Sequence, residues 1–324
     1  MEAKVTHFNP LARILKSTPG MVFFVTIMIS ALVHLSTGNF YSAYNLGTLV
    51  RQVSFTIIVA FGQTLVLILG GIDLSVAGIS AFCSMSFALM STKTGINPFL
   101  CLFIAILIGG CLGTISGFVI CKLDITPFIV TLATGSIYTG VVYVVTRGKP
   151  VVGIPANVAR MGQGMLFDVI PYPAIAMLVI CFMLIFVLKN TAFGRHIYAI
   201  GGNAIAANIV GVRINRVKIM TYAISGVLAS IAGTLMVCRL ASSQVNIGEN
   251  WVMPSITAVI LGGTSMSGGS GGVGGTIIGG LMMGVISTSI VLLGISSYWE
   301  TIVTGSVVII AVAIDAIRQK QQTR

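Results

Sequence analysis

Charged residues are scarce in this chain. Lys and Arg number 18, Asp and Glu only 7, and together they make up 8% of the 324 residues. Hydrophobic residues fill 56% of the positions, and the mean hydropathy of +1.04 lies far above the globular range. This composition excludes a soluble fold. Because a helix needs about 20 apolar residues to cross the hydrocarbon core, the length allows roughly ten spans and no sizeable soluble domain.

The sequence also lacks the motifs of common catalytic and metal sites. It contains no Walker A motif, no H-E-x-x-H and no C-x-x-C pair. The three histidines are far apart, and the six cysteines fall in or at the ends of apolar segments, where cysteine usually behaves as a small hydrophobe. We therefore expect a protein that is not an enzyme and has no metal, cofactor or disulfide framework. Any energy-harvesting domain must come from another chain.

The basic residues gather at particular places. Three lie before the first apolar run, five in the acid-free segment 189–218, and three at the end of the chain: Lys4, Arg13, Lys16, Lys189, Arg195, Arg213, Arg216, Lys218, Arg318, Lys320 and Arg324. By the positive-inside rule, this pattern puts that segment and both termini in the cytoplasm. The net charge of +11 would suggest nucleic acid for a soluble protein, but here we expect no nucleic-acid partner.

Ten apolar runs predict an all-α, polytopic membrane protein with about ten transmembrane or broken helices and glycine-rich packing. The runs cover residues 20–37, 45–70, 71–92, 97–121, 125–146, 171–188, 217–239, 252–268, 271–294 and 298–316. An even number of spans that starts inside returns the C-terminus to the cytoplasm. We therefore expect a cytoplasmic segment 1–19, a transmembrane domain 20–316 with a cytoplasmic loop at about 189–218, and a cytoplasmic tail 317–324.

Glycine interrupts two of these runs in a related way. Ile68-Leu69-Gly70-Gly71 precedes Asp73, and Ile260-Leu261-Gly262-Gly263 precedes Ser265, at an offset of 192 residues. Unwound backbone at membrane depth is tolerated only where it lines a cavity or is buried in protein, so the breaks point to a transport pathway. The sequence leaves open whether the two halves form a true repeat, and whether the runs around each break are full spans, broken helices or re-entrant hairpins.

Asp73 is the strongest single candidate for a functional side chain. A carboxylate between two apolar runs is costly unless it faces a polar cavity, reaches water or finds a partner. Two roles stay open for it: a residue of the pathway or its gate, or a cap near the cytoplasmic interface for the helix that begins around Leu74.

The cytoplasmic segment from Thr191 to Arg213 carries a second candidate site. After Gly201 and Gly202, Asn203 can cap a short helix that runs to about Val210 and is ended by Gly211. A small helix with apolar residues on the cytoplasmic face suits docking to a partner protein.

These segments together resemble a known family, the membrane permeases of ribose-type ABC importers. The residues that carry the resemblance are Gly70-Gly71-Ile72-Asp73-Leu74-Ser75-Val76, Thr126-Pro127-Phe128-Ile129-Val130-Thr131-Leu132, the segment 194–211 and Leu261-Gly262-Gly263-Thr264-Ser265. The similarity extends from about residue 20 to 316. One departure is that many members carry Glu-Leu-Asp at the start of the eighth span, where this chain has Val252-Met253-Pro254 and Glu249 is the nearby acid.

The resemblance implies a multi-pass permease of the bacterial cytoplasmic (inner) membrane that works as a homodimer. Its implied partners are an ABC ATPase subunit inside, an extracytoplasmic sugar-binding protein outside and a monosaccharide cargo. The implied ATPase-coupling residues are Gly194, Arg195, Gly201, Gly202, Asn203, Ala207 and Gly211. The residues implied for the translocation path or gate are Asp73, Ser75, Thr126, Phe128, Thr264 and Ser265.

Our leading hypothesis is therefore a permease subunit of an ATP-driven importer of ribose-like sugars, which moves its cargo by alternating access. The alternative is a proton-coupled secondary transporter of a small polar solute that uses Asp73 as its proton site. A third hypothesis is a membrane scaffold or receptor subunit without transport. The sequence does not name the cargo.

Overall fold

The computed structural model describes residues 18–296 and 298–322, and the surroundings of side chains up to residue 313. Within these residues, eight helices are long and apolar enough to cross a membrane, and a ninth helix contributes a shorter apolar stretch, Tyr298–Ala313. The prediction of an all-α polytopic membrane protein is confirmed. Most of the predicted N-terminal segment, with Lys4, Arg13 and Lys16, lies outside the described residues, as does Arg324.

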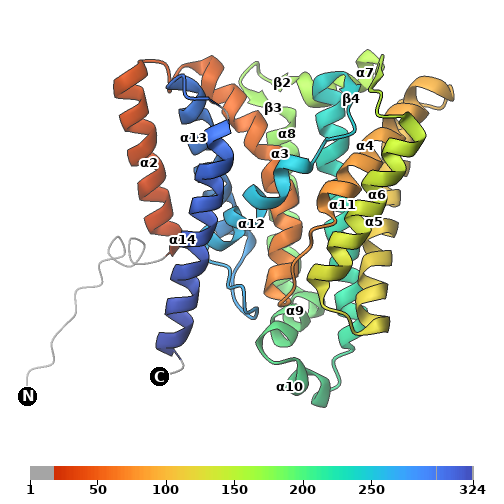
Figure 1. The fold of residues 1–324 in the computed structure, drawn as a ribbon, viewed down its shortest axis with the longest axis vertical. Helices are drawn as coiled ribbons and strands as arrows, with labels where there is room; N and C mark the ends of the chain where they lie inside the picture. Colours follow the sequence, from red (N-terminus) through yellow and green to blue (C-terminus); the bar gives the residue numbers. More distant parts are fainter. Residues whose placement is uncertain (1–17, 297, 323–324) are drawn as a thin grey trace, which may run out of the picture.

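The first half of the chain folds into five long helices (Figure 1). They are α2 (Thr18–Thr37), α3 (Ala43–Ile68), α4 (Val76–Lys93), α5 (Pro98–Leu123) and α6 (Pro127–Thr146). Local signals set several of their ends. Asn97 caps α5 by accepting a hydrogen bond from the Phe99 amide at 2.9 Å. Proline at the first positions of α5 and α6 fits there because the first helical N–H has no partner within a helix.

Short elements cover one end of the molecule. They are β1 (Val151–Val152), α7 (Ala156–Gln163), β2 (Met165–Leu166), β3 (Ile170–Pro171) and β4 (Ser242–Ser243). β1 pairs antiparallel with β4, and β2 pairs antiparallel with β3. The β1–β4 pair ties the connection after α6 to the connection after the long central helix α11 (Ile214–Leu240).

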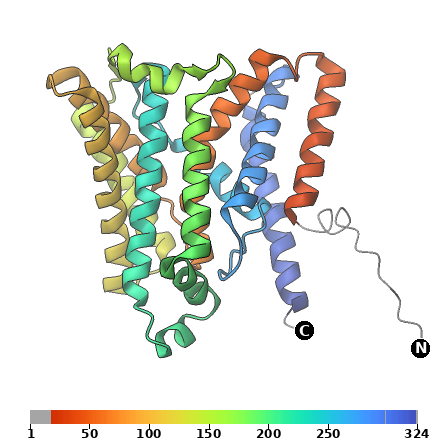
Figure 2. The ribbon, with the colours of Figure 1, turned by 180° about the vertical axis from the view of Figure 1, so that it is seen from behind.

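The opposite end carries two short helices that project beyond the bundle (Figures 1 and 2). Helix α8 (Tyr172–Asn190) leads to α9 (Ala192–Gly202) and α10 (Ala204–Ile209), and α11 then returns through the bundle. The chain continues through the 3-10 turn η1 (Glu249–Trp251), α12 (Val252–Leu261), α13 (Val273–Leu292) and α14 (Tyr298–Gln322). Helix α2 begins, and α14 ends, toward the same side as α9 and α10 (Figure 1).

The structure corrects the prediction at both glycine breaks. The runs 45–70 and 71–92 do not meet at Gly70 and Gly71, because α3 ends at Ile68 and α4 begins only at Val76. The run 252–268 does not form a full helical span: α12 has ten residues, and at about 1.5 Å per residue it is about half the length that a bilayer requires. At both places non-helical backbone replaces the missing helical turns: residues 69–75 before α4, and a loop with turns and bends, residues 262–272, after α12.

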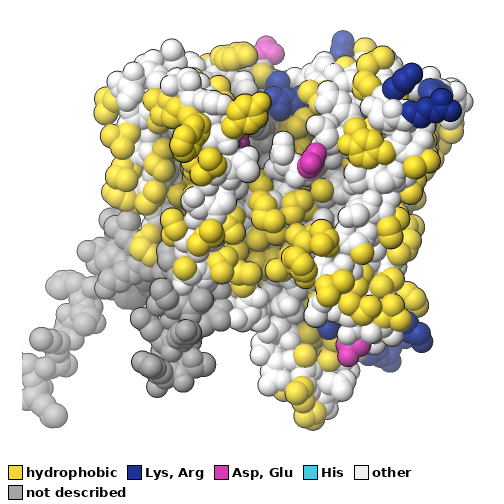
Figure 3. All heavy atoms as spheres, in the orientation of Figure 1, with side chains coloured by type: hydrophobic (Ala, Val, Ile, Leu, Met, Phe, Trp, Pro, Cys, Tyr) yellow, Lys and Arg dark blue, Asp and Glu magenta, His cyan; other side chains and the backbone are white. Residues whose placement is uncertain are grey.

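Helices α3 and α11 form the core, and α2 and α5 lie at its edge. In the most apolar part of α3, 83% of the residues are buried, against 28% in α2 and α5. The outer helices instead present apolar side chains on the surface, as expected of lipid-facing helices (Figure 3). Of the six cysteines, all of them free, four are buried as small hydrophobes, whereas Cys111 is exposed on α5 and Cys121 is partly exposed.

Glycine allows helices to approach closely. Gly109, Gly113 and Gly117 lie four residues apart, a spacing that predicts close contact of their helix with a neighbour, and the structure confirms it. A Cβ on Gly113 would lie 2.2 Å from the Tyr222 carbonyl oxygen, so only glycine fits where α5 meets α11. A Cβ on Gly279 would similarly lie 2.0 Å from the Ala258 carbonyl oxygen of α12. A second four-residue spacing predicts that Gly271, Gly275 and Gly279 share one helix face. This prediction is wrong at Gly271, which precedes α13 and has a φ of 131°.

Candidate functional site

The two glycine breaks have the same backbone geometry. The Gly70 amide bonds to the Leu67 carbonyl at 2.8 Å, and the Gly263 amide bonds to the Ile260 carbonyl at 2.9 Å. Gly70 and Gly263 both have a φ of 86°, a left-handed conformation that favours glycine. The Gly71 and Thr264 amides then bond to the Val66 and Val259 carbonyls in the manner of a Schellman motif. In the structure Gly70 corresponds to Gly263, an offset of 193 residues, whereas the matching sequence letters gave an offset of 192 residues.

The two breaks meet each other at the end of the molecule that bears α9. The Gly269 amide, in the loop after α12, donates to the Ile68 carbonyl oxygen at 2.8 Å. A Cβ on Gly268 would lie 3.0 Å from the Gly70 nitrogen. Segments almost 200 positions apart in the sequence are therefore in backbone contact.

Helix α9 completes this contact. A Cβ on Gly201 would lie 1.8 Å from the Ile68 carbonyl oxygen and 2.5 Å from the Gly269 nitrogen. We call the contact of Ile68, Gly70, Gly201, Gly268 and Gly269 the glycine junction. Close by, the Tyr198 hydroxyl donates to the Gly271 carbonyl oxygen at 2.9 Å. Burial raises the pKa of Tyr198 above its ordinary value, so this hydroxyl keeps its proton.

Beyond α9, the short helix α10 forms as predicted. Asn203 caps it by accepting a hydrogen bond from the Ala206 amide at 3.0 Å, and Gly211 follows it with a φ of 85°. Ala207 is the buried residue of α10. Three large apolar side chains of this region are 76–80% exposed: Ile205, Ile209 and Val210. Helix α10, which carries Ile205 and Ile209, projects beyond the bundle (Figure 1), so this small apolar surface is accessible to another protein.

The other predicted coupling residues lie on α9. Arg195 is exposed, and Gly202 is open, because a Cβ there would meet nothing within 4 Å. Gly194 is buried against the end of α8, where a Cβ would lie 2.3 Å from the Leu188 carbonyl oxygen. Thr191 caps α9 by accepting a hydrogen bond from the Gly194 amide at 3.2 Å.

Asp73 lies in the extended segment between α3 and α4 and is completely buried. One carboxylate oxygen accepts hydrogen bonds from the Ser75 amide and hydroxyl, and the other accepts one from the Ser225 hydroxyl of α11 at 2.7 Å. The side-chain amide of Gln63 also bonds to the main chain of Asp73. The carboxylate thus holds the extended segment against α11. It does not cap a helix at Leu74, because α4 begins two residues later.

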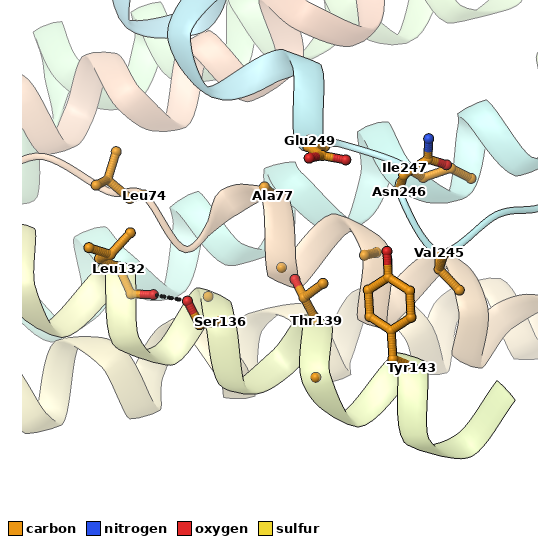
Figure 4. Close-up of a pocket in the computed structure, with 14 residues that line it drawn as sticks. Leu74, Ala77, Leu132, Ser136, Thr139, Tyr143, Val245, Asn246, Ile247 and Glu249 are labelled. Carbon is orange, nitrogen blue, oxygen red and sulfur yellow. Dashed lines mark hydrogen bonds between the residues drawn. The ribbon is translucent and has the colours of Figure 1, made fainter. Parts of the chain in front are cut away.

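A cavity of about 600 Å³ opens next to this segment (Figure 4). Leu74 and the first turn of α4 form one wall, and α6 and the loop before α12 form the others. Five polar side chains line it: Ser136, Thr139, Tyr143, Asn246 and Glu249. Those of α6 follow the spacing i, i+3 and i+7, which places them on one helix face. The sequence analysis did not identify this polar face. The spacing of Ser136, Thr139 and Tyr143 along an otherwise apolar helix could have indicated it.

The residues predicted for the path or gate lie at separate places. Ser75 and Thr264 are buried beside the two breaks, where the Thr264 hydroxyl accepts a hydrogen bond from the Gly272 amide at 3.4 Å. Ser265 is partly exposed in the loop after α12, and its hydroxyl accepts one from the Ser267 amide at 3.2 Å. Thr126 and Phe128 are exposed at the start of α6, and neither lines the cavity.

Comparison with known proteins shows the family. The family described as "Branched-chain amino acid transport system / permease component" matches residues 45–312. The ribose import permease protein RbsC of Bacillus subtilis (strain 168) is 40% identical over 316 residues, which cover 97% of this chain and 96% of the relative. The corresponding protein of Escherichia coli is 35% identical, over 90% of this chain and 92% of the relative.

A relative with another printed cargo is also similar. The fructose import permease protein FrcC of Rhizobium meliloti is 32% identical over 96% of this chain and 89% of the relative. No solved structure matches the chain. The family match and these identities over nearly the whole chain establish that the protein belongs to the ribose-type permeases of ABC importers.

Proposed function

We propose that this chain forms the translocation path of an ATP-driven importer of ribose-like monosaccharides. The relatives named above are import permeases for ribose and fructose, and the similarity extends over almost the entire chain. These similarities favour the ATP-driven importer over the proton-coupled alternative. The hydrogen bonds of Asp73 also support a structural role for that carboxylate, because each of its oxygens has a donor in place.

The single observation that carries the mechanism is the contact of α9 with both glycine breaks. The partner ATPase docks on the exposed apolar residues of α10, and its closing and opening displace α9. Because Gly201 touches the Ile68 carbonyl and the Gly269 amide directly, α9 moves both non-helical segments, 69–75 and 262–272, at once. Gly194, Arg195, Gly202, Asn203, Ala207 and Gly211 give this coupling segment its shape and its cytoplasmic surface.

The two non-helical segments, residues 69–75 and 262–272, are the moving parts of the path. Asp73 and Ser75 hold the first segment to α11, and Thr264 and Ser265 shape the second. Thr126 and Phe128 begin α6 next to the first segment and act with it as a gate at the cytoplasmic side. An extracytoplasmic sugar-binding protein delivers the cargo at the end that carries α7 and the short strands. A second copy of the chain completes the path, and both termini lie in the cytoplasm.

Uptake in cells tests this proposal. A strain that lacks its own ribose permease is given this chain together with its ATPase and binding protein, and entry of radiolabelled D-ribose is measured. We expect uptake only when all three proteins are present. Uptake by this chain alone, or none with the complete set, would overturn the proposal.

The orientation has a separate test. Single cysteines at Ile209 and at Phe167, in the loop between β2 and β3, are treated with a membrane-impermeant maleimide in intact cells. We expect labelling at position 167 only. Labelling at position 209 from outside would reverse the topology.

A further inference from the structure

The cavity beside α4 has the features of a ligand site. Its volume of about 600 Å³ lies within the range of sites for small molecules. It is also next to the moving part of the path, because Leu74 lines it and the Leu74 amide donates to the Thr131 hydroxyl at 3.1 Å. The cavity therefore shares a wall with the segment that leads to the glycine junction.

The polar groups in the cavity are free to bind a ligand. Among the described residues, the side chains of Glu249, Tyr143 and Thr139 have no hydrogen-bond partner. Ser136 donates to the Leu132 carbonyl at 3.0 Å, which leaves its hydroxyl oxygen able to accept. Figure 4 shows Glu249 on the side of the cavity opposite Ser136 and Thr139. A ligand between them would meet a carboxylate on one side and hydroxyls on the other.

The charges in the cavity restrict the class of ligand. Among the described residues that line it, Glu249 is the one with a charged side chain, and none is Lys or Arg. An anionic ligand such as a sugar phosphate would face this carboxylate without a cation to offset the repulsion. An amino acid could pair its ammonium group with Glu249, but its own carboxylate would meet only neutral donors and no cation. A neutral molecule with several hydroxyls can donate to Glu249 and exchange hydrogen bonds with Asn246 and the hydroxyls of α6.

We propose that this cavity is a cargo-binding site within the permease, selective for uncharged polyhydroxyl molecules, with Glu249 as the principal acceptor. This inference rests on the proposed function, in which the chain conducts sugars, and adds that the permease itself discriminates among solutes. Glu249 and the polar face of α6 then determine specificity together with the binding protein.

Protection from labelling tests the inference without transport. In the purified complex, Thr139→Cys is treated with a water-soluble maleimide, and the parent chain gives the background from Cys111. We expect millimolar D-ribose to slow the labelling, and D-ribose 5-phosphate and isoleucine to have no effect. Adding Glu249→Gln should raise the half-protecting ribose concentration about tenfold, the loss expected for one hydrogen bond to a charged group. No labelling of the Thr139→Cys variant above background, equal protection by all three probes, or no shift with Glu249→Gln would overturn the inference.

A pair of glycine substitutions provides an independent test. Gly140 lines the cavity, and a Cβ there would meet nothing within 4 Å, so Gly140→Phe adds a ring in open space and obstructs the site. Gly305 on α14 is equally open and lies away from the cavity. We expect Gly140→Phe to abolish ATP-driven ribose uptake and Gly305→Phe to preserve it. Normal uptake by Gly140→Phe would contradict the inference. Absence of uptake in the parent complex, with ribose protection intact, would count against the proposed function and not against the site.

Discussion

The alpha carbon of Gly201 is so close to the carbonyl oxygen of Ile68 that a Cβ added to Gly201 would lie 1.8 Å from that oxygen. Ile68 is the last residue of α3, and its carbonyl also accepts the Gly269 amide from the loop after α12. One residue of helix α9 therefore touches both places where glycine breaks the membrane helices. We therefore expect a displacement of α9 to change both breaks, because tightly packed backbone leaves little free space to absorb it.

Gly201→Ala should force the glycine junction apart. The new methyl group meets backbone atoms, which cannot rotate away as a side chain can, so we expect a loss of about 1–3 kcal/mol or more of stability and strongly reduced uptake. The matched control is Gly202→Ala, on the same helix in open space, which should behave as the parent. Thermal unfolding in detergent and ATP-driven ribose uptake measure the two effects. Equal behaviour of the two variants would contradict the junction.

Tyr198→Phe should weaken the link between α9 and the loop before α13. The substitution removes the hydroxyl that donates to the Gly271 carbonyl at 2.9 Å, at a cost of about 1 kcal/mol. We expect fewer sugars transported for each ATP hydrolysed. Because burial raises the pKa of Tyr198, its hydroxyl stays protonated and the difference between the two proteins should be constant from about pH 6 to 9. A deficit that disappears as the pH rises within this range would refute the assignment.

Ser225→Ala should loosen the extended segment that precedes α4. The Ser225 hydroxyl is the donor to one oxygen of the buried Asp73 carboxylate, and its loss leaves that oxygen unpaired at a cost of about 2–3 kcal/mol. Ser306→Ala is the control, because the Ser306 hydroxyl is exposed and bonds only within α14, to the Ile302 carbonyl. Thermal unfolding should separate the two variants clearly. If Ser225→Ala is as stable as Ser306→Ala, Asp73 does not hold the segment through Ser225.

Ile209→Asp should prevent binding of the ATPase without unfolding the permease. Ile209 is 80% exposed, so the substitution removes few internal contacts and places a charge in the docking surface. We expect the ATPase to be lost on purification of the complex, while the melting temperature of the permease alone is unchanged. Phe167→Asp, at a residue 85% exposed in the connection between β2 and β3, should retain the ATPase. Retention by the Ile209 variant would show that the ATPase docks elsewhere.

Most of the helical architecture could be predicted from apolar runs, because a bilayer imposes a simple requirement of length and hydropathy. Asn203 further indicated the start of the short helix α10. The half-length of α12 could not be read from the sequence. Residues 262–268 carry no charge and, apart from Met266, are small, so they satisfy a hydropathy pattern equally well as helix or loop.

Less of the candidate site than of the fold could be predicted from the sequence. The glycine pairs at 70–71 and 262–263 were visible in the sequence. The contacts of Gly201 with Ile68 and Gly269, however, join residues 133 and 68 positions apart and depend on tertiary packing. The polar face of α6 was visible in the spacing of Ser136, Thr139 and Tyr143. Glu249 lines the same cavity only because the loop before η1 folds back over α4, and no local sequence pattern predicts that arrangement.

The most direct test of the account is the energy source for transport. The purified permease is reconstituted in liposomes with its ATPase and binding protein, and D-ribose accumulation is measured with ATP on the side of α10 or with a proton gradient alone. We predict accumulation with ATP, none with the gradient, and none with ATP when the complex carries Gly201→Ala. Accumulation driven by the gradient without ATP, or undiminished ATP-driven accumulation in the Gly201 variant, would contradict the account.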